Sequence, residues 1–599
     1  MTSDRMNKMR MPAAATIAVA LLVSLPAFSQ VAPSKTVTAQ IAAIQQIKQN
    51  LTASQKKMDS GLAFATVAQS NPKAAAVVAI AAPLSKTQSG KVLVDVKGTV
   101  TDSLLELIKK VGGDVIYSSP RWGSIRAAIP MSAVESVAAR SDVARISSRV
   151  WAHTNVGALT SQGYVAHRDK QVVEQKGVNG GGINVGVLSD SASAAEIAAL
   201  KASGDLPPTA HALAGQDGAP GSDEGAAMME IVYDMAPGSN QIFATAFSGQ
   251  AGFADNIIAL QAAGCKVIVD DVTYFEEPVF QDGVIAKAVN QVVADGSIYF
   301  SSAANSGSKK KGTSGTWEGD FKDGGPATGI LAGLGHVHDF GGGQVFDQFT
   351  APPSGLVFLQ WSDPFGNACD DYDLYVTDST GTVLKAFSAD TQTCPGSDPV
   401  EGLQYNTAAA GDRIYIVLFN GTQKALHLDT ERSNIAINTD GATFGHNAAM
   451  NGVTAAATFW GSARKGVVPF TGFANPVESF SSDGPRKIFF DPNGNAITPG
   501  NFLFSTNGGT TLKKPDLTGA DGIFAKTPGF TPFYGTSAAA PHLAGIAALV
   551  LEVRPGYTPA QVKKAMTASA LDTEAVGWDE NSGFGIAMSS GAVNYALAH

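Results

Sequence analysis

The chain has 599 residues, of which 44% are apolar and 16% charged, and its formal net charge is -10 at pH 7. This length allows more than one domain, and the negative charge leaves no basic footprint for nucleic acid. No basic amphipathic stretch indicates a membrane surface, so we expect neither of these partners.

Residues 1–29 are predicted to be a signal peptide. Basic residues within the first ten positions precede the apolar run 13–25, and the small residues at 27–29 offer a cleavage site. The run is too short to span a bilayer comfortably, so we expect export rather than an uncleaved anchor. The protein is therefore predicted to be extracellular or periplasmic, with no membrane span after signal removal.

Residues 30–150 divide into two stretches. The first, up to about residue 90, is rich in Ala, Gln and Lys with weak helical periodicity, and we expect a loosely structured lead-in. The second, 91–148, predicts strands and helices in the order β-α-β-β-α-β, which is the ferredoxin-like order. The strands are expected at 92–96, 115–118, 124–129 and 143–146, and the helices at 103–111 and 131–139.

Two apolar strands in the next part of the chain end in carboxylates. Ile183 to Leu188 is apolar enough to be central in a parallel sheet and is followed by Asp190. In open α/β sheets, chemistry collects at the carboxyl ends of the strands, which makes Asp190 a candidate. A second strand ends in Asp270 and Asp271, two carboxylates that are ordinarily solvated at such a strand end.

Two further polar residues stand at element boundaries. Glu224 opens an apolar helix, where a carboxylate also interacts favourably with the helix dipole. Asn305 follows the predicted strand 297–302 in a turn, where an Asx turn is the ordinary alternative.

An all-β insertion is predicted at 335–442. Strands at 356–361, 372–377, 383–387, 413–419 and 426–429 alternate with Gly-, Asp- and Asn-rich turns. Its acidic residues either bind calcium or are solvated in turns. Cys369 and Cys394 flank one loop and could pair, closing a loop worth about 3 kcal/mol, whereas Cys265 is expected to be a buried free thiol. No cysteine spacing indicates a metal site, so metal ligands stay unassigned.

The run Phe533-Tyr-Gly-Thr-Ser537-Ala-Ala-Ala-Pro541-His542 leads into the apolar segment 543–551. Gly535 allows a tight turn, and Pro541 is tolerable only near the start of a helix. Ser537 would meet the positive end of the helix dipole and free backbone N–H groups, which suit a nucleophilic hydroxyl and its oxyanion. A helix that is apolar on every face must be buried.

This run resembles the nucleophile helix of subtilisin-like serine peptidases, and the resemblance implies a doubly wound parallel α/β sheet. The region 91–148 resembles the inhibitory propeptide of such precursors, the alternative being a permanent small domain. Ser189-Asp190-Ser191 resembles the strand end that carries the catalytic aspartate, and Ala303-Ala304-Asn305-Ser306-Gly307 resembles the turn whose asparagine amide holds the oxyanion. In this family the strand that here ends in Asp270 and Asp271 lines the substrate cleft, so the resemblance implies that one of them shapes a specificity pocket, the alternative being a solvated strand end. The insertion resembles the small β-sandwich often attached to secreted peptidases.

The resemblance departs from the subtilisin pattern at the base. Subtilisins open the corresponding helix with a histidine, and Glu224 takes that place here. None of the nine histidines is followed by Gly-Thr as in that family. Sedolisins, relatives that use a glutamate base, have an aspartate one helical turn onward, where this chain has Met228. The resemblance therefore implies a hybrid triad of Ser537, Glu224 and Asp190, with Asp190 orienting Glu224.

The sequence as a whole predicts a zymogen of a secreted serine endopeptidase. The expected parts are the signal peptide, the propeptide 30–150, catalytic halves at 151–334 and 443–599, and the insertion between them. Its expected partners are protein or peptide substrates and its own propeptide, and no cofactor is required for the chemistry. Because two carboxylates are expected to share a proton, the optimum is predicted to be acidic. The alternative is an inactive binding or scaffold protein that has lost its histidine.

Overall fold

The structure is a computed structural model, and it describes residues 35–71, 77–78, 80–81, 84–87, 89–148, 152–153, 161–461 and 468–599. The chain divides into the units Met1–Ala32 and Pro33–His599. The predicted signal peptide lies outside the described residues.

A seven-stranded sheet with strand order β25-β22-β11-β9-β6-β8-β7 forms the centre of the fold, and each strand is parallel to its neighbours. The strands are β6 Asn184–Ser189, β7 His211–Ala212, β8 Asn240–Thr245, β9 Val267–Asp270, β11 Ile298–Ser302, β22 Val453–Phe459 and β25 Leu517–Asp521. Every residue of β9 and β11 is buried, as expected for strands covered on both faces. The predicted parallel α/β sheet is thus confirmed.

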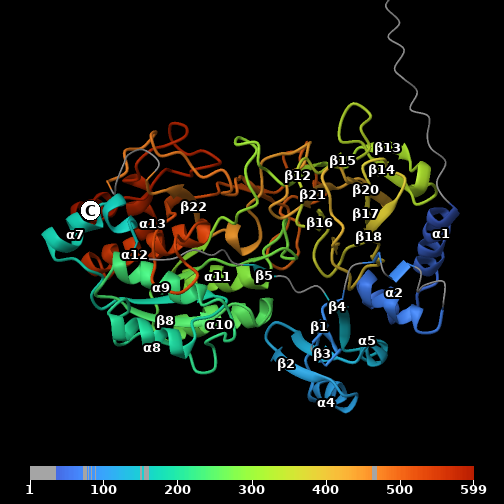
Figure 1. Ribbon diagram of the computed structural model, residues 1–599, viewed down its shortest axis with the longest axis horizontal. Helices are drawn as coiled ribbons and strands as arrows, with labels where there is room; N and C mark the ends of the chain where they lie inside the picture. The colour runs from blue at the N-terminus through green and yellow to red at the C-terminus, as the bar shows by residue number, and fades with distance from the viewer. Residues whose placement is uncertain are drawn as a thin grey trace, which may run out of the picture. The chain divides into compact units, whose positions relative to one another are not determined.

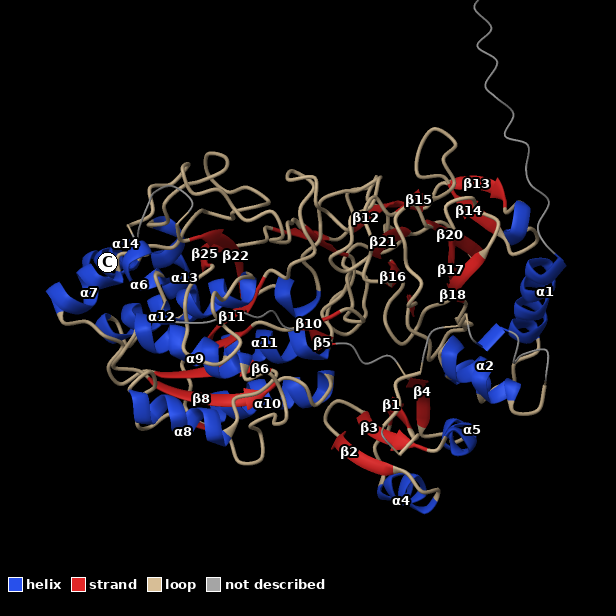
Figure 2. Ribbon diagram, in the orientation of Figure 1, coloured by secondary structure: helices blue, strands red, loops and turns tan. Residues whose placement is uncertain are grey.

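Helices cover both faces of this sheet because successive strand residues point to opposite sides. In β9, Val267 and Val269 pack in one apolar core, whereas Ile268 packs in the other. Helices α9 Glu224–Met235, α12 Thr536–Val553, α13 Pro559–Ala568 and α14 Ser589–Ala598 belong to the first core, and helices α10 Gln250–Ala262 and α11 Val284–Ala294 to the second. Figure 2 shows the strands lying between these helices.

Shorter elements complete this part of the chain. They are β5 Ala152–His153, α6 Gly163–Ala166, α7 Asp169–Lys176, α8 Ala194–Ser203, β10 Thr273–Tyr274, η4 Gly445–Ala448, β23 Arg486–Ile488 and β24 Thr510–Leu512. Within the described part of the chain, α12 is the one helix long and apolar enough to cross a membrane, and 89% of that stretch is buried inside the protein. A core helix passes such a test because it is apolar on every face.

The N-terminal region, residues 35–148, contains a four-stranded antiparallel sheet of order β2-β3-β1-β4. Its elements follow one another as β1 Val92–Gly98, α4 Asp102–Lys110, β2 Asp114–Ser119, β3 Ser124–Ile129, α5 Val134–Ala138 and β4 Val143–Ser147, with the short η2 Met131–Ala133 before α5. This order agrees with the sequence-based expectation.

The stretch before this sheet differs from the prediction of a loosely structured lead-in. It forms helices α1 Lys35–Gln49 and α2 Ser60–Ala68, with the short η1 Gln55–Lys57 between them. In α1, Val37, Ile41 and Ile44 are buried at spacings of three and four residues, which is the pattern of a helix with one apolar face. The prediction was wrong here because that face is covered by residues far along the chain (Figure 1).

The inserted part consists of two antiparallel sheets, with strand orders β12-β21-β16-β19 and β13-β14-β20-β17-β18, and β15 pairs with β20. Their strands are β12 Thr316–Asp320, β13 Asp323–Pro326, β14 His336–His338, β15 Asp347–Gln348, β16 Leu356–Trp361, β17 Asp371–Thr377, β18 Leu384–Ser388, β19 Val400–Gln404, β20 Arg413–Asn420 and β21 Ala425–Asp429, with η3 Gly329–Leu331 between β13 and β14. Because β12 pairs with β21, these sheets begin at Thr316, ahead of the expected boundary at 335.

The cysteines stand as the sequence predicts. Cys369 and Cys394 form a disulfide within the insertion, and Cys265 is a buried free thiol. Burial raises the pKa of the Cys265 thiol to about 12, so this side chain behaves as a small apolar group.

Candidate active site

Ser537 is the second residue of the buried helix α12, close to the carboxyl end of β25. The preceding Gly535 has φ 109°, a conformation that favours glycine, and its N–H donates to Asp521 Oδ2 at 3.1 Å. This contact fixes the helix start at the edge of the sheet where strand ends collect. The first turn of a helix has backbone N–H groups without intrahelical acceptors and the positive end of the helix dipole.

Asn305 lies against the same first turn of α12. Thr536 donates to Asn305 Oδ1 through both its backbone N–H and its Oγ1, each at 3.1 Å, although 231 positions separate the two residues. Asn305 follows Ala304, a non-glycine residue at φ 74°, so the turn after β11 is held in a strained conformation. The structure therefore brings the predicted oxyanion donor beside the predicted nucleophile's helix.

Glu224 is the first residue of α9 and its side chain is fully buried. Helix α9 can begin this close to the sheet because the next residue is glycine. A Cβ at Gly225 would lie 2.2 Å from Phe243 Cε2 on β8. The sequence thus forces an acidic side chain into the interior at a helix start, where the helix dipole favours its charged form.

The carboxylate of Asp190 contacts the backbone around Glu224. Its Oδ1 accepts from the Ser191 N–H at 2.5 Å and the Glu224 N–H at 3.1 Å. Its Oδ2 accepts from the N–H and the Oγ of Ser222, at 2.5 and 2.6 Å. Asp190 therefore holds the loop that leads into α9 and the first N–H group of that helix, as a capping residue does.

Asp271 interacts with the side chain of Glu224. It follows β9 and is only 2% exposed. Burial raises the pKa of Asp271 to about 8, and the charges of Asp270 and Asp190 add to this rise. Hydrogen bonds from the Glu224 and Ser189 side chains act in the opposite direction and lower the pKa. The two buried carboxyls therefore share a proton at neutral and acidic pH, and the protonated one donates a hydrogen bond to the other.

Asp270 lies in the interior and belongs to a different network. Its Oδ1 lies 3.1 Å from His446 Nε2 and accepts from Ser301 Oγ at 3.1 Å, and the other ring nitrogen of His446 contacts Glu277. Burial alone would lower the pKa of His446, but the Glu277 and Asp270 charges raise it to about 10. A buried imidazolium between two carboxylates thus ties β9 to the segment before β22. Of the two carboxylates considered for a substrate pocket, Asp271 alone lines a cavity with Asn305.

That cavity is small and its wall includes a residue that the sequence did not single out. Arg432, which follows β21 of the insertion, lines it together with Asp271, Thr273, Ala304 and Asn305. No local motif marks Arg432, and only the fold brings the insertion to this place. One short strand also runs beside the cavity: β5 pairs antiparallel with β10, with His153 opposite Thr273.

Several described histidines have partners of their own. His542 Nδ1 contacts the Ala538 carbonyl oxygen and its Nε2 lies 2.5 Å from Ser161 Oγ, and burial holds the pKa of His542 well below its usual value. His211 is exposed on the edge strand β7. Within the described ranges, no group of three or more His, Cys, Asp or Glu side chains is arranged to hold a metal ion, and structural calcium stays a prediction.

Residues 443–585 match the Subtilase family. Among curated proteins, fervidolysin of Fervidobacterium pennivorans is 35% identical over 65 residues, 11% of this chain and 9% of its own length. The subtilisin-like proteases SBT1.9 and SBT4.14 of Arabidopsis thaliana are 35% identical over 101 residues and 41% over 99 residues, each match covering 16% of this chain. The matched segments span 9% to 13% of the length of these relatives. These matches point to a serine peptidase.

Two solved structures are also similar. The CspB protease of Clostridium perfringens has a TM-score of 0.46 at 14% identity, covering 72% of this chain and 97% of that chain. Fervidolysin of Fervidobacterium pennivorans, a keratinolytic enzyme related to subtilisin, has a TM-score of 0.38 at 13% identity, covering 86% and 62%.

Proposed function

We propose that the protein is a secreted serine endopeptidase that hydrolyses peptide bonds through an acyl-enzyme on Ser537. The match of residues 443–585 to the Subtilase family supports the peptidase assignment. The observation that carries the assignment of residues is the pair of hydrogen bonds from Thr536 to Asn305 Oδ1. These bonds join the start of α12 to the turn after β11. Because Asn305 Oδ1 accepts both of them, the NH₂ group of the amide is the part that would donate to an oxyanion.

In the proposed reaction, the Ser537 Oγ attacks the scissile carbonyl carbon and Glu224 accepts the hydroxyl proton. The carbonyl electron pair moves onto oxygen, where the Asn305 amide and the Ser537 backbone N–H stabilise it. When the tetrahedral intermediate collapses, Glu224 returns the proton to the leaving amine. Water then hydrolyses the acyl-enzyme by the same steps, with Glu224 taking a proton from the water.

The acidic neighbours of Glu224 have two different roles in this proposal. Asp190 fixes the backbone at the start of α9. Glu224 and Asp271 share one proton, and the hydrogen bond between these two buried carboxyls holds the orientation of the Glu224 side chain. The arrangement favours activity at acidic and neutral pH, below about pH 8, where the pair holds its shared proton and Glu224 still provides the base.

We further propose that the N-terminal region is the propeptide of a zymogen. An antiparallel strand added to a free strand edge is how peptidic ligands commonly bind, and β5 occupies that position on β10, beside the cavity of Asp271 and Asn305. This pairing supports the proposal that residues 152–153 bind as a substrate strand of the chain's own active site. After removal of the propeptide, protein and peptide substrates would pair with the same edge of β10.

Covalent labelling tests the nucleophile. The processed protein is incubated with a fluorophosphonate probe between pH 4 and 8, with Ser537→Ala as the control. We expect label on Ser537 and hydrolysis of a denatured protein substrate that Glu224→Gln largely abolishes. Absence of label at every pH would assign the chain to the inactive scaffold class, and full activity in Glu224→Gln would remove the glutamate base.

A further inference from the structure

The β insertion contacts the N-terminal region through one continuous apolar core. Helices α1 and α2 contribute Ile44 and Phe64, and the insertion contributes Tyr375, Phe387 and Val417. The rings of Phe64 and Phe387 meet edge to face with centroids 5.4 Å apart. This surface is separate from the contact of the N-terminal region with α10, where Tyr117, Ser119 and Trp122 donate hydrogen bonds to Asp255.

At the centre of this contact is a buried ion-pair cluster. Lys48 of α1 lies with its Nζ 2.8 Å from Asp371 Oδ1 and 2.5 Å from Asp373 Oδ1, both on β17. All three side chains are at least nine-tenths buried. Burial alone would lower the pKa of Lys48, but the charges of Asp373 and Asp371 outweigh it and raise the pKa. Without Lys48, Asp371 and Asp373 would lose the cation that both contact, and Asp373 would keep the hydrogen bond that Tyr375 donates to its Oδ2 at 3.0 Å.

A second buried pair joins the insertion to β4. Arg145 lies with its Nη2 2.7 Å from Asp390 Oδ2, and Asp390 Oδ1 accepts from the Ser60 N–H at the start of α2. One aspartate of the insertion thus holds two elements of the N-terminal region at once, a helix start and a strand.

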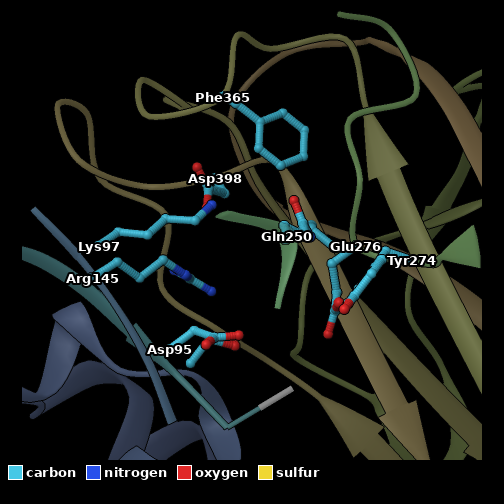
Figure 3. Close-up of a pocket in the computed structure, with 10 residues that line it drawn as sticks. Asp95, Lys97, Arg145, Gln250, Tyr274, Glu276, Phe365 and Asp398 are labelled. Atoms are coloured by element: carbon cyan, nitrogen blue, oxygen red, sulfur yellow. The ribbon is translucent and has the colours of Figure 1, made fainter. Parts of the chain in front are cut away.

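The third contact lies at a pocket where three parts of the chain meet (Figure 3). Lys97 of β1 points toward Asp398 of the insertion, with its Nζ 2.8 Å from Asp398 Oδ2. Burial would raise the pKa of Asp398, but the charges of Lys97 and Arg145 hold it below its usual value. Gln250 and Tyr274, on the other side of the pocket, come from the part of the chain that carries the parallel sheet.

We propose that the acidic face of the β insertion is a docking surface, formed by Asp371, Asp373, Asp390 and Asp398 with the apolar residues around them. This surface retains the N-terminal region after the chain has been cut between His153 and Ser161. Three cations from three different elements meet carboxylates of this face, which sets both position and orientation. Buried charges of one sign are unfavourable without their partners, so the face suits a partner that brings cations and apolar side chains to matching positions. The inference takes from the proposed function only the step of cutting; the retention itself does not need catalysis.

The test separates docking from catalysis by using the full chain with Ser537→Ala and a recognition sequence for a site-specific protease between His153 and Ser161. After the added protease has cut the chain, the release rate of the N-terminal fragment is measured by size-exclusion chromatography over time. We expect the fragment to stay bound in the parent chain. Lys48→Met should release it about 100-fold faster or more, because loss of one partner leaves buried carboxylates uncompensated.

Matched variants make the outcome decisive. Lys97→Met removes a half-exposed cation and should accelerate release by about fivefold, which also carries the test if Lys48→Met does not fold. Lys91→Met removes an equally charged side chain whose partner, Asp114, lies in the N-terminal region and is 66% exposed, so release should be unchanged. Rapid release from the parent chain, or equal acceleration by Lys91→Met, overturns the proposal. Failure of Ser537 labelling would leave this result untouched.

Discussion

The protonated state of Asp271 gives the candidate site a defined pH dependence. The pKa of Asp271 is raised to about 8. A raised pKa means that the protein favours the neutral form, which is present below pH 8 and lost as the pH rises through that value. The protonated fraction is then about 90% at pH 7 and about 1% at pH 10. If only this form orients Glu224, kcat/KM should fall about tenfold for each pH unit above 8.

The perturbation that tests this is Asp271→Asn, which keeps a neutral hydrogen-bond donor at every pH. We expect this variant to retain activity near pH 6 within about one order of magnitude and to lose the alkaline limb. The assay is kcat/KM for a fluorescently labelled denatured protein substrate from pH 4 to 10 at constant ionic strength.

Two comparisons decide the result. Asp440→Asn, a change of the same kind at a side chain 43% exposed on the insertion, should leave the limb at pH 8 in place. The reasoning is refuted if the parent enzyme keeps its rate to pH 10. A limb near pH 8 that persists in Asp271→Asn would refute it as well, because another group would then be responsible.

Three further predictions concern stability, measured by denaturant unfolding of the Ser537→Ala chain. The pKa of His446 rises from 6.5 to about 10, so its pairing stabilises the fold fully below pH 6.5, and this stabilisation is lost as the pH rises toward 10. The difference in the free energy of unfolding between the parent and His446→Gln should therefore shrink by about 5 kcal/mol from pH 6.5 to pH 10. A difference that stays constant over this range contradicts the prediction. Gly545→Ala places a Cβ 2.4 Å from a side-chain carbon of α9 and should cost about 2 kcal/mol, whereas Gly556→Ala, with open space, should not. Replacing Cys369 and Cys394 by Ser should cost about 3 kcal/mol, and an unchanged unfolding midpoint would show that this bridge stabilises nothing.

The sequence predicted best those elements whose signals are local. The strand that became β9 was visible as an uninterrupted apolar run, and the helices that start at Glu224 and beside Ser537 were marked by a polar residue before an apolar stretch. Helix α1 was missed because Lys48 reads as a solvent-facing residue until its two aspartates, more than 300 positions later, are placed against it.

The arrangement of acidic groups in the candidate site could not be read in the same way. The sequence prediction gave Asp190 the task of orienting Glu224, and the structure places its carboxylate on backbone N–H groups of the same loop. Asp271, considered only for substrate binding, lies against the Glu224 side chain. Asp190 and Asp271 stand at neighbouring strand ends, and the direction of their side chains decides which of them faces Glu224. The spacing of residues in the sequence does not specify that direction.

The place where the insertion joins the parallel sheet has a consequence for how such proteins diversify. The chain leaves the sheet at the end of β11 and returns at the adjacent strand β22, and Thr443 Oγ1 bonds the Ala303 carbonyl at 3.0 Å, so departure and return touch. Lengthening a connection whose ends are already joined costs little conformational entropy. The connection between β11 and β22 is therefore a position where domains of different size can be inserted or replaced without a change in the register of the sheet.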